Sequence, residues 1–184
     1  MSTILALDLS KSSTGFALWD TAASRPVSGT WLLGSSMTTT GQACINLHQR
    51  LNDLYSVSPF DTVIYESPLN LDSSKLVTNA DTTFLLIGLA VHVDSFCEAK
   101  RVRKYRCVNQ TTWRRHFIGS MKRGTKTVQW KAYAMERCIQ LGFRPAKHDE
   151  AEALGVLDYM CEMEGIVPPW RRDEVLRPPL SLAR

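Results

Sequence analysis

The chain has 184 residues, of which 44% are hydrophobic and 22% charged, with a formal net charge of +4. This length suits one domain with one core, and the composition is ordinary for a globular protein. No apolar stretch is expected to approach the roughly 20 residues of a membrane span, and the start, MSTILALDLS, does not have the pattern of a signal peptide. We therefore expect no membrane partner.

The cysteines argue for a reducing compartment. They are scattered, odd in number and contain no CxxC pair, which disfavours structural zinc and a disulfide framework. A cytoplasmic location fits this pattern best. The five cysteines are Cys44, Cys97, Cys107, Cys138 and Cys161.

Three strands are predicted at the beginning of the chain. Residues 3–9 form a short apolar run typical of a buried strand, residues 14–20 alternate as a second strand, and residues 27–34 form a third. The short, turn-prone connections between them favour antiparallel hairpins.

The next elements alternate between helix and strand. Apolar residues at helical spacing predict a helix over residues 41–56, followed by a fourth strand at residues 62–66. Residues 67–79 are rich in turn formers and are expected to form a mobile loop. A strongly apolar helix over about residues 80–99 follows, and its length suggests a central core helix.

The last part of the chain predicts one strand and three helices. The fifth strand covers residues 102–108, and Asn109 or Thr111 can cap a short helix that contains Trp113 and Phe117. A basic loop with glycines leads to a helix over residues 127–141, with Gly142 as its C′ residue. The final helix spans residues 149–163.

This order of elements predicts an α/β fold with a mixed five-stranded sheet flanked by helices. We expect residues 1–164 to form a single domain. Residues 165–184 contain several prolines and are expected to form an irregular C-terminal tail.

The charge is distributed unevenly. Residues 1–99 carry a net charge of −5, residues 100–131 carry +11 with no acidic residue, and residues 132–184 carry −2. A run of charge is usually a solvated surface, but the absence of acids over 32 residues favours contact with a nucleic acid or another polyanion.

Four acidic residues stand at unusual positions. Asp8 lies in the first apolar strand, Glu66 ends the fourth, and Asp149 and Glu152 share one face of the first turn of the last helix. A carboxylate in an apolar strand is costly to bury without a partner. Acids at a helix N-terminus are common, because the helix dipole favours them, so the last pair alone is a weak signal.

A divalent metal is the simplest partner for these carboxylates. Mg²⁺ prefers carboxylate oxygen and water as ligands. Two metal ions about 3.5–4 Å apart can activate a water and stabilise the leaving oxygen of a phosphodiester. The sequence therefore predicts a metal-dependent nuclease with Mg²⁺ or Mn²⁺, and two ions are expected.

Three segments that contain these acids resemble a known family. They are LDLSKSSTG around Asp8, VIYESP around Glu66, and DEAEALGVL from Asp149 onwards. Together and in this order they resemble RuvC-type Holliday-junction resolvases of the ribonuclease-H-like superfamily, and more closely the divergent phage-type branch. The resemblance covers residues 3 to about 160.

The resemblance implies a crossover-junction endodeoxyribonuclease that acts on four-way DNA junctions as a homodimer. By position, Asp8, Glu66, Asp149 and Glu152 would be the catalytic metal ligands. The residues expected to contact DNA are Lys11, Arg103, Lys104, Arg106, Arg114, Arg115, Lys122, Arg123 and Lys126. Ordinary exposure in a turn is an equally good explanation for Lys11.

Some features depart from the family pattern. The last acid is usually Asp, whereas Glu152 has a longer arm, and the neighbouring His148 and Glu150 allow the assignment to shift by one residue. The loop after the fourth strand carries Leu69 and Leu71 where the family often has an aromatic wedge.

Other functions remain open at this stage. The same fold and acids would serve a broader branched-DNA nuclease or an RNA/DNA-hybrid nuclease. A nucleic-acid-binding module without catalysis is a further alternative. For Trp113 and Trp130, packing in the core or at a dimer interface is favoured over base stacking.

Overall fold

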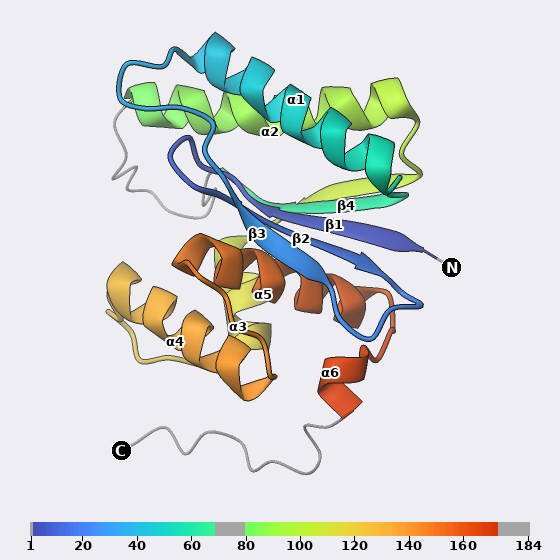
Figure 1. The fold of residues 1–184 in the computed structure, drawn as a ribbon. Helices are drawn as coiled ribbons and strands as arrows, with labels where there is room; N and C mark the ends of the chain where they lie inside the picture. Colours follow the sequence, from blue (N-terminus) through green and yellow to red (C-terminus); the bar gives the residue numbers. More distant parts are fainter. Residues whose placement is uncertain (1, 69–79, 173–184) are drawn as a thin grey trace.

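The computed structural model describes residues 2–68 and 80–172, and its strands form one mixed sheet, as predicted (Figure 1). The strands are β1 (Thr3–Asp8), β2 (Thr14–Asp20), β3 (Val27–Trp31), β4 (Thr62–Glu66) and β5 (Lys104–Val108). Their order in the sheet is β3-β2-β1-β4-β5. The pairs β1–β2 and β2–β3 are antiparallel, and the pairs β1–β4 and β4–β5 are parallel.

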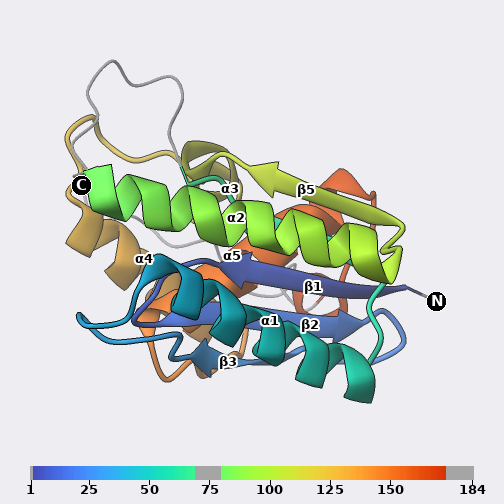
Figure 2. The ribbon, with the colours of Figure 1, turned by 90° about the horizontal axis from the view of Figure 1, so that it is seen from above.

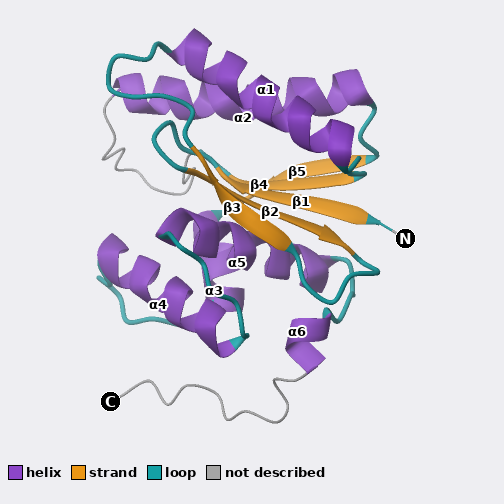
Figure 3. Ribbon diagram, viewed as in Figure 1, coloured by secondary structure: helices purple, strands orange, loops and turns teal. Residues whose placement is uncertain are grey.

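Helices cover both faces of this sheet (Figure 3). They are α1 (Thr40–Val57), α2 (Ala80–Lys100), α3 (Gln110–Phe117), α4 (Thr127–Gln140), α5 (His148–Met163) and α6 (Pro169–Arg172). Helices α1 and α2 lie side by side over one face, as the view from above shows (Figure 2). The other four helices lie on the opposite face, where α5 packs directly on β1 and β2.

The alternation of side chains along β1 assigns its residues to two cores. Leu5 and Leu7 pack with α1 and α2, whereas Ile4 and Ala6 belong to the core shared with α3, α4 and α5. Because successive strand residues point to opposite faces, Asp8 lies on the same face as Ile4 and Ala6. The first strand thus directs its carboxylate toward α5.

Helix α2 is more apolar than the sequence analysis allowed. With 21 residues, it is the one helix in the described part of the chain that is long and apolar enough to cross a membrane by length and composition, so the expectation that no stretch approaches this length was wrong. Such a helix can equally be a core helix. Here Leu89, Val93 and Phe96 pack in the core beneath α1 and α2, whereas Phe84 and Val91 are exposed.

The element boundaries follow the sequence with small differences. Strand β3 ends at Trp31 rather than at residue 34, and β5 begins at Lys104. Asn109 caps α3 by accepting a hydrogen bond from the backbone N–H of Thr111. Gly142 follows α4 with a φ of 79°, the left-handed conformation expected of a C′ glycine.

The segment expected to be an irregular tail is ordered where the structure describes it. Residues 169–172 form α6, and the ring of Trp170 packs against Trp19 and Phe143 at centroid distances of 4.8 and 5.5 Å. A single aromatic anchor can bind a short segment to the core, and composition does not show this. Residues 173–184 lie outside the described part.

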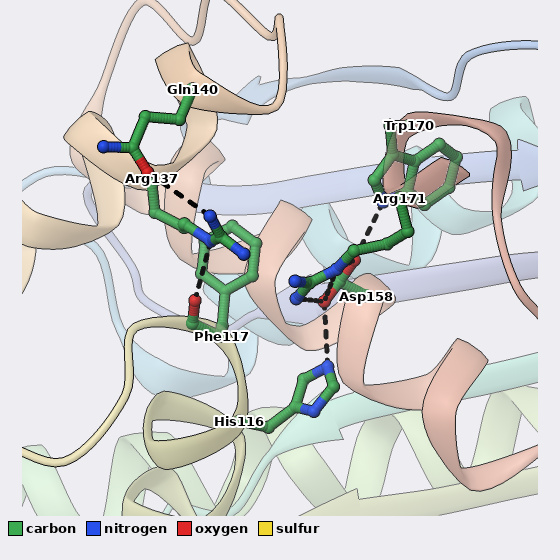
Figure 4. Close-up of polar contacts among 7 residues, drawn as sticks. All are labelled: His116, Phe117, Arg137, Gln140, Asp158, Trp170 and Arg171. Atoms are coloured by element: carbon green, nitrogen blue, oxygen red, sulfur yellow. Dashed lines mark hydrogen bonds and ion pairs between the residues drawn. The ribbon is translucent and has the colours of Figure 1, made fainter. Parts of the chain in front are cut away.

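One buried acid holds three helices together (Figure 4). Asp158 of α5 accepts hydrogen bonds from His116 Nε2 of α3 at 2.9 Å and, on α6, from Trp170 Nε1 at 2.8 Å and Arg171 Nε at 2.9 Å. Although burial opposes the charge, these bonds and the Arg171 guanidinium lower the pKa of Asp158 to about 2. We call these four residues the Asp158 clasp.

Candidate metal centre

Two neighbouring strands present the first two acids. Leu7 of β1 pairs with Tyr65 of β4 in parallel register, so Asp8 and Glu66 follow directly at the same edge of the sheet. Glu66 has the same parity as Ile64, which belongs to the core around α5. Both carboxylates therefore lie on the α5 side, as the predicted strand pairing required.

A glycine lets helix α5 approach this edge. Gly15 of β2 pairs with Asp8, and a Cβ atom at Gly15 would lie 1.9 Å from the backbone oxygen of Asp149. No side chain fits in that space. The Thr-Gly pair after the first acid is therefore needed so that the first turn of α5 can reach β1.

The loop before Gly15 is also held locally. The hydroxyl of Thr14 is buried, accepts a hydrogen bond from the backbone N–H of Ser10 at 3.1 Å and bonds to the Ser10 carbonyl oxygen. These bonds close the β1–β2 turn directly after Asp8.

The approach of α5 brings three acids together. Ligand oxygens of Asp8, Asp149 and Glu152 all lie within 4.8 Å of one another. Hard divalent cations such as Mg²⁺ and Mn²⁺ favour oxygen donors of this kind, so the residues present fit such an ion.

Glu66 lies beside this group, and two donors of α3 hold it. Its Oε1 accepts a hydrogen bond from Gln110 Nε2 at 2.6 Å, and its Oε2 accepts one from Trp113 Nε1 at 2.8 Å. Trp113 is fully buried. It is therefore a core residue that orients a site carboxylate, which agrees with the packing role favoured from the sequence.

The crowding of acids raises two pKa values. Burial, followed by the charges of Glu66, Glu152 and Asp149, raises the pKa of Asp8 well above its usual range. Burial raises the pKa of Glu66 to about 7, against the opposing charge of Arg114, and Glu152 adds to the rise. The four carboxylates thus repel one another, which is the electrostatic setting that a bound cation relieves.

Two basic side chains compensate part of this charge. Arg114 forms an ion pair with Oε1 of Glu152, and Lys131 Nζ of α4 lies 3.1 Å from Asp149 Oδ1 and 3.7 Å from Glu152 Oε2. Although burial of Lys131 opposes its charge, the hydrogen bond to Asp149 and the charges of Glu152 and Asp149 raise its pKa.

The two residues of the alternative assignment, Glu150 and His148, lie away from the cluster. Glu150 points away from the cluster, because it accepts hydrogen bonds from Ser28 Oγ at 2.7 Å and from the backbone N–H of Ala146 at 2.8 Å. His148 is exposed at the first position of α5. Asp149 and Glu152 are the two acids of this helix that face Asp8.

Comparison with known proteins gives a result only at the level of structure. No protein-family model and no curated protein sequence matches the chain. RuvC of Thermus thermophilus in complex with a Holliday-junction substrate superposes with a TM-score of 0.63 at 9% identity, covering 90% of this chain and 97% of RuvC.

Two resolvases from other sources give similar values. The yeast mitochondrial Holliday-junction resolvase Ydc2 matches with a TM-score of 0.58 at 10% identity, over 95% of this chain and 80% of Ydc2. The fowlpox virus Holliday-junction resolvase matches with a TM-score of 0.56 at 12% identity, over 88% and 99%. The chain has the fold of RuvC-type resolvases.

Within this RuvC-like fold, Arg114 is not where the sequence analysis expected it. It was predicted to contact DNA, but its side chain is 6% exposed and is paired with Glu152. A basic residue that follows a tryptophan in a short helix can face either way, and here the helical spacing turns Arg114 inward and Arg115 outward. The assignment of Arg114 to a DNA surface was wrong.

The other predicted DNA contacts of the RuvC-like fold divide into two groups. Arg103 and Lys104 lie at the N-terminal end of β5, whereas the acids lie at the C-terminal ends of β1 and β4. The Nζ of Lys104 is 2.5 Å from the Glu164 carboxylate. The group nearer the carboxylate edge or in the loop between α3 and α4 comprises Lys11, Arg106, Arg115, Lys122, Arg123 and Lys126.

Two surface hollows accompany these basic residues. One of about 460 Å³ is formed by the loop before α4 and includes Lys122, Arg123 and Tyr133. The second, of about 310 Å³, includes Lys11, whose Nζ donates to the Thr38 carbonyl oxygen at 3.2 Å. Leu69 and Leu71, named for the missing aromatic wedge, lie outside the described residues.

Sequence reasoning missed Gln110 and Lys131 as residues that contact the carboxylates of the candidate metal centre. Neither stands beside an acid in the sequence, and each reaches its carboxylate only through the packing of α3 and α4 against α5. The one sequence signal for Lys131 was its place in residues 100–131, which carry a net charge of +11. That signal does not distinguish Lys131 from the basic residues on the surface.

Proposed function

We propose that this protein is a metal-dependent, structure-selective DNA endonuclease that nicks four-way junctions. The observation that carries the proposal is the convergence of Asp8, Asp149 and Glu152 within 4.8 Å, beside Glu66, at one edge of a RuvC-like sheet. Burying several carboxylates together is costly without a cation, and the metal ions of a nuclease would offset that cost.

Asp8, Asp149 and Glu152 would hold Mg²⁺ or Mn²⁺, and Glu66 would contribute from the neighbouring strand. The metal supplies charge stabilisation at the phosphate and an activated water. The chain itself contributes orientation, because Trp113 and Gln110 fix the two oxygens of Glu66 and Arg114 fixes one oxygen of Glu152. Four carboxylates are enough for two ions, so we keep two as the expected number.

The DNA would lie along the basic residues near the carboxylate edge. Lys122, Arg123 and Lys126 are exposed in the loop before α4, and Arg115 is exposed on α3. Such contacts position a phosphate backbone without reading its sequence. Lys11, in the turn after β1, is placed to contact a phosphate close to Asp8.

We further propose that the enzyme acts as a homodimer in the cytoplasm. Two opposed nicks in a four-way junction require two active sites, which a dimer supplies. The cytoplasmic location is supported by five cysteines that are all free. The division into a nuclease domain at residues 1–164 and a tail at residues 165–184 stays a prediction, with α6 as the part of the tail that packs on the domain.

Cleavage of a synthetic four-way junction, a Y-fork, an RNA/DNA hybrid and a linear duplex tests the proposal. Wild type and Asp8→Asn would be compared with Mg²⁺, with Mn²⁺ and with EDTA. We expect paired, symmetric nicks in the junction that disappear in EDTA and in the variant. Wild-type rates in Asp8→Asn would refute the mechanism.

The other substrates distinguish the alternatives. Equal cutting of the fork would indicate a broader branched-DNA nuclease, and preferred cutting of the hybrid would indicate a ribonuclease. Tight binding of the junction with no cutting under either metal would indicate a binding module.

A further inference from the structure

Two cations contact Glu152, and they differ in how firmly they are held. Arg114 of α3 is paired with Oε1, and Lys131 of α4 lies 3.7 Å from Oε2. Glu152 itself is 2% exposed. The side chain of Arg114 is 6% exposed, whereas that of Lys131 is 34% exposed.

Arg114 is fixed by its surroundings. Its guanidinium carbon lies 5.3 Å from the ring centre of Trp113 and 5.8 Å from that of Trp130. Helix α3 sits tightly on α5 at Gly155, where a Cβ atom would lie 2.7 Å from Trp113 and 2.9 Å from Phe117. Its buried position between these rings restricts the arginine more than the partly exposed position of Lys131 restricts the lysine.

Lys131 has the opposite character. Its Nζ reaches Asp149 and Glu152, two members of the acidic cluster, and its charge is also felt by Asp8. The lysine stem is flexible and its ammonium is strongly hydrated, so it can exchange its protein partners for water. An ammonium and a divalent ion on the same carboxylates would repel each other strongly in a partly buried site.

We propose that these two cations have opposite effects on metal binding. Arg114 is a positioning residue that holds Oε1 of Glu152 and leaves Oε2 facing the cluster. Lys131 is an exchangeable counter-ion that competes with the metal and leaves Asp149 and Glu152 when the metal binds. The inference rests on the proposed metal-dependent function and specifies how the site is regulated.

The proposal predicts opposite signs for two substitutions that each remove one positive charge. Lys131→Met removes the competitor and is expected to raise Mn²⁺ affinity roughly threefold to tenfold. Arg114→Gln removes the orienting contact and is expected to lower it about tenfold or more. If only net charge mattered, both substitutions would raise the affinity.

Calorimetric titration of the full chain with Mn²⁺, at fixed pH and without DNA, measures this directly. Arg50→Gln and Lys100→Met are matched controls, because they remove the same charges from the layer of α1 and α2 on the other face of the sheet. Thermal unfolding in EDTA shows whether each variant is folded. Arg114→Lys is the second variant, which keeps the charge and should restore part of the affinity.

The outcomes separate this inference from the proposed function. If Mn²⁺ binds wild type but not Asp8→Asn, and the two signs are opposite, both ideas are supported. If Mn²⁺ binds in the same way but both variants gain affinity, or Lys131→Met loses it, the inference is overturned and the proposed function stands. If wild type and Asp8→Asn bind Mn²⁺ equally poorly, both are overturned.

Discussion

Helix α5 carries two nearly inaccessible acids six residues apart, and their surroundings are opposite. Glu152 is 2% exposed and lies among three other carboxylates, with Arg114 and Lys131 as the cations in contact with it, whereas Asp158 is 1% exposed and accepts hydrogen bonds from His116, Arg171 and Trp170. The pKa of Asp158 falls to about 2, while burial and neighbouring acids raise the pKa of Asp8 and Glu66.

This difference separates a binding site from a structural contact. At the Asp158 clasp the donors satisfy the acid, so nothing more is needed and the contact stabilises the fold. At the candidate metal centre four carboxylates face two basic side chains. Their remaining mutual repulsion destabilises the fold, and a further cation would offset it. Burial alone would have assigned the two acids the same role.

The largest expected effect comes from exchanging each acid for its amide and measuring cleavage. Asp149→Asn removes a candidate ligand and should lower the rate of junction cleavage roughly a thousandfold or more, with folding retained. Asp158→Asn should keep most of the cleavage rate at a temperature where it is folded. Single-turnover assays on the two variants measure the contrast, and equal losses would contradict the division between site and clasp.

Asp158 should contribute more to the stability of the fold than to cleavage. Asp158→Asn leaves Arg171 and His116 without their buried partner, and we expect the free energy of unfolding at pH 7 to fall by about 3 kcal/mol. Urea unfolding measures this. The pKa of Asp158 is lowered in the folded state, so its contribution is present above pH of about 4 and is lost as the pH falls through about 2.

Neutralising Glu66, a carboxylate of the candidate metal centre, should stabilise the protein when no metal is bound. Because the folded pKa of Glu66 is raised to about 7, its ionisation opposes folding, and stability declines as the pH rises from about 4.5 to about 7. In EDTA at pH 8, Glu66→Gln should raise the free energy of unfolding by about 1–2 kcal/mol. Excess Mg²⁺ should remove this gain, and a destabilised variant in EDTA would contradict the electrostatic description.

The smallest expected effect concerns one donor of the clasp. His116→Gln removes one of several hydrogen bonds to Asp158 and should lower the free energy of unfolding by about 1 kcal/mol. Arg171 and Trp170 still satisfy the carboxylate. If His116→Gln lowers the free energy of unfolding as much as Asp158→Asn in the same urea titration, then His116 rather than Arg171 is the main stabilising partner of Asp158.

The strands and the four acids were predictable for a local reason. Apolar runs define β1 and β4, and Asp8 and Glu66 interrupt them at fixed positions, so strand pairing alone brings the two together. The i, i+3 spacing of Asp149 and Glu152 places both on one face of α5. The predicted mixed sheet and its antiparallel start were confirmed for the same reason.

The surroundings of the acids could not be predicted, because they come from helix packing. Arg114 appeared to be one basic residue among eleven, and the packing of α3 on α5 brings it to Glu152. Trp170 appeared to belong to a tail, and only its contacts with Trp19 and Phe143 show that it anchors α6.

The sequence by itself determined the order of the five strands and of the helices up to α5, and the basic segment, since these follow from periodicity and spacing along the chain; the four candidate ligands came from the resemblance of three segments to a known family. Tertiary structure alone decided which cations reach the acids, that Glu150 faces away, and that the pKa of Asp158 is lowered by its donors while burial and neighbouring acids raise the pKa of Asp8. The physical reason is that the electrostatics of a buried group depend on neighbours from distant segments, and only the packing of helices on the sheet brings those neighbours within reach.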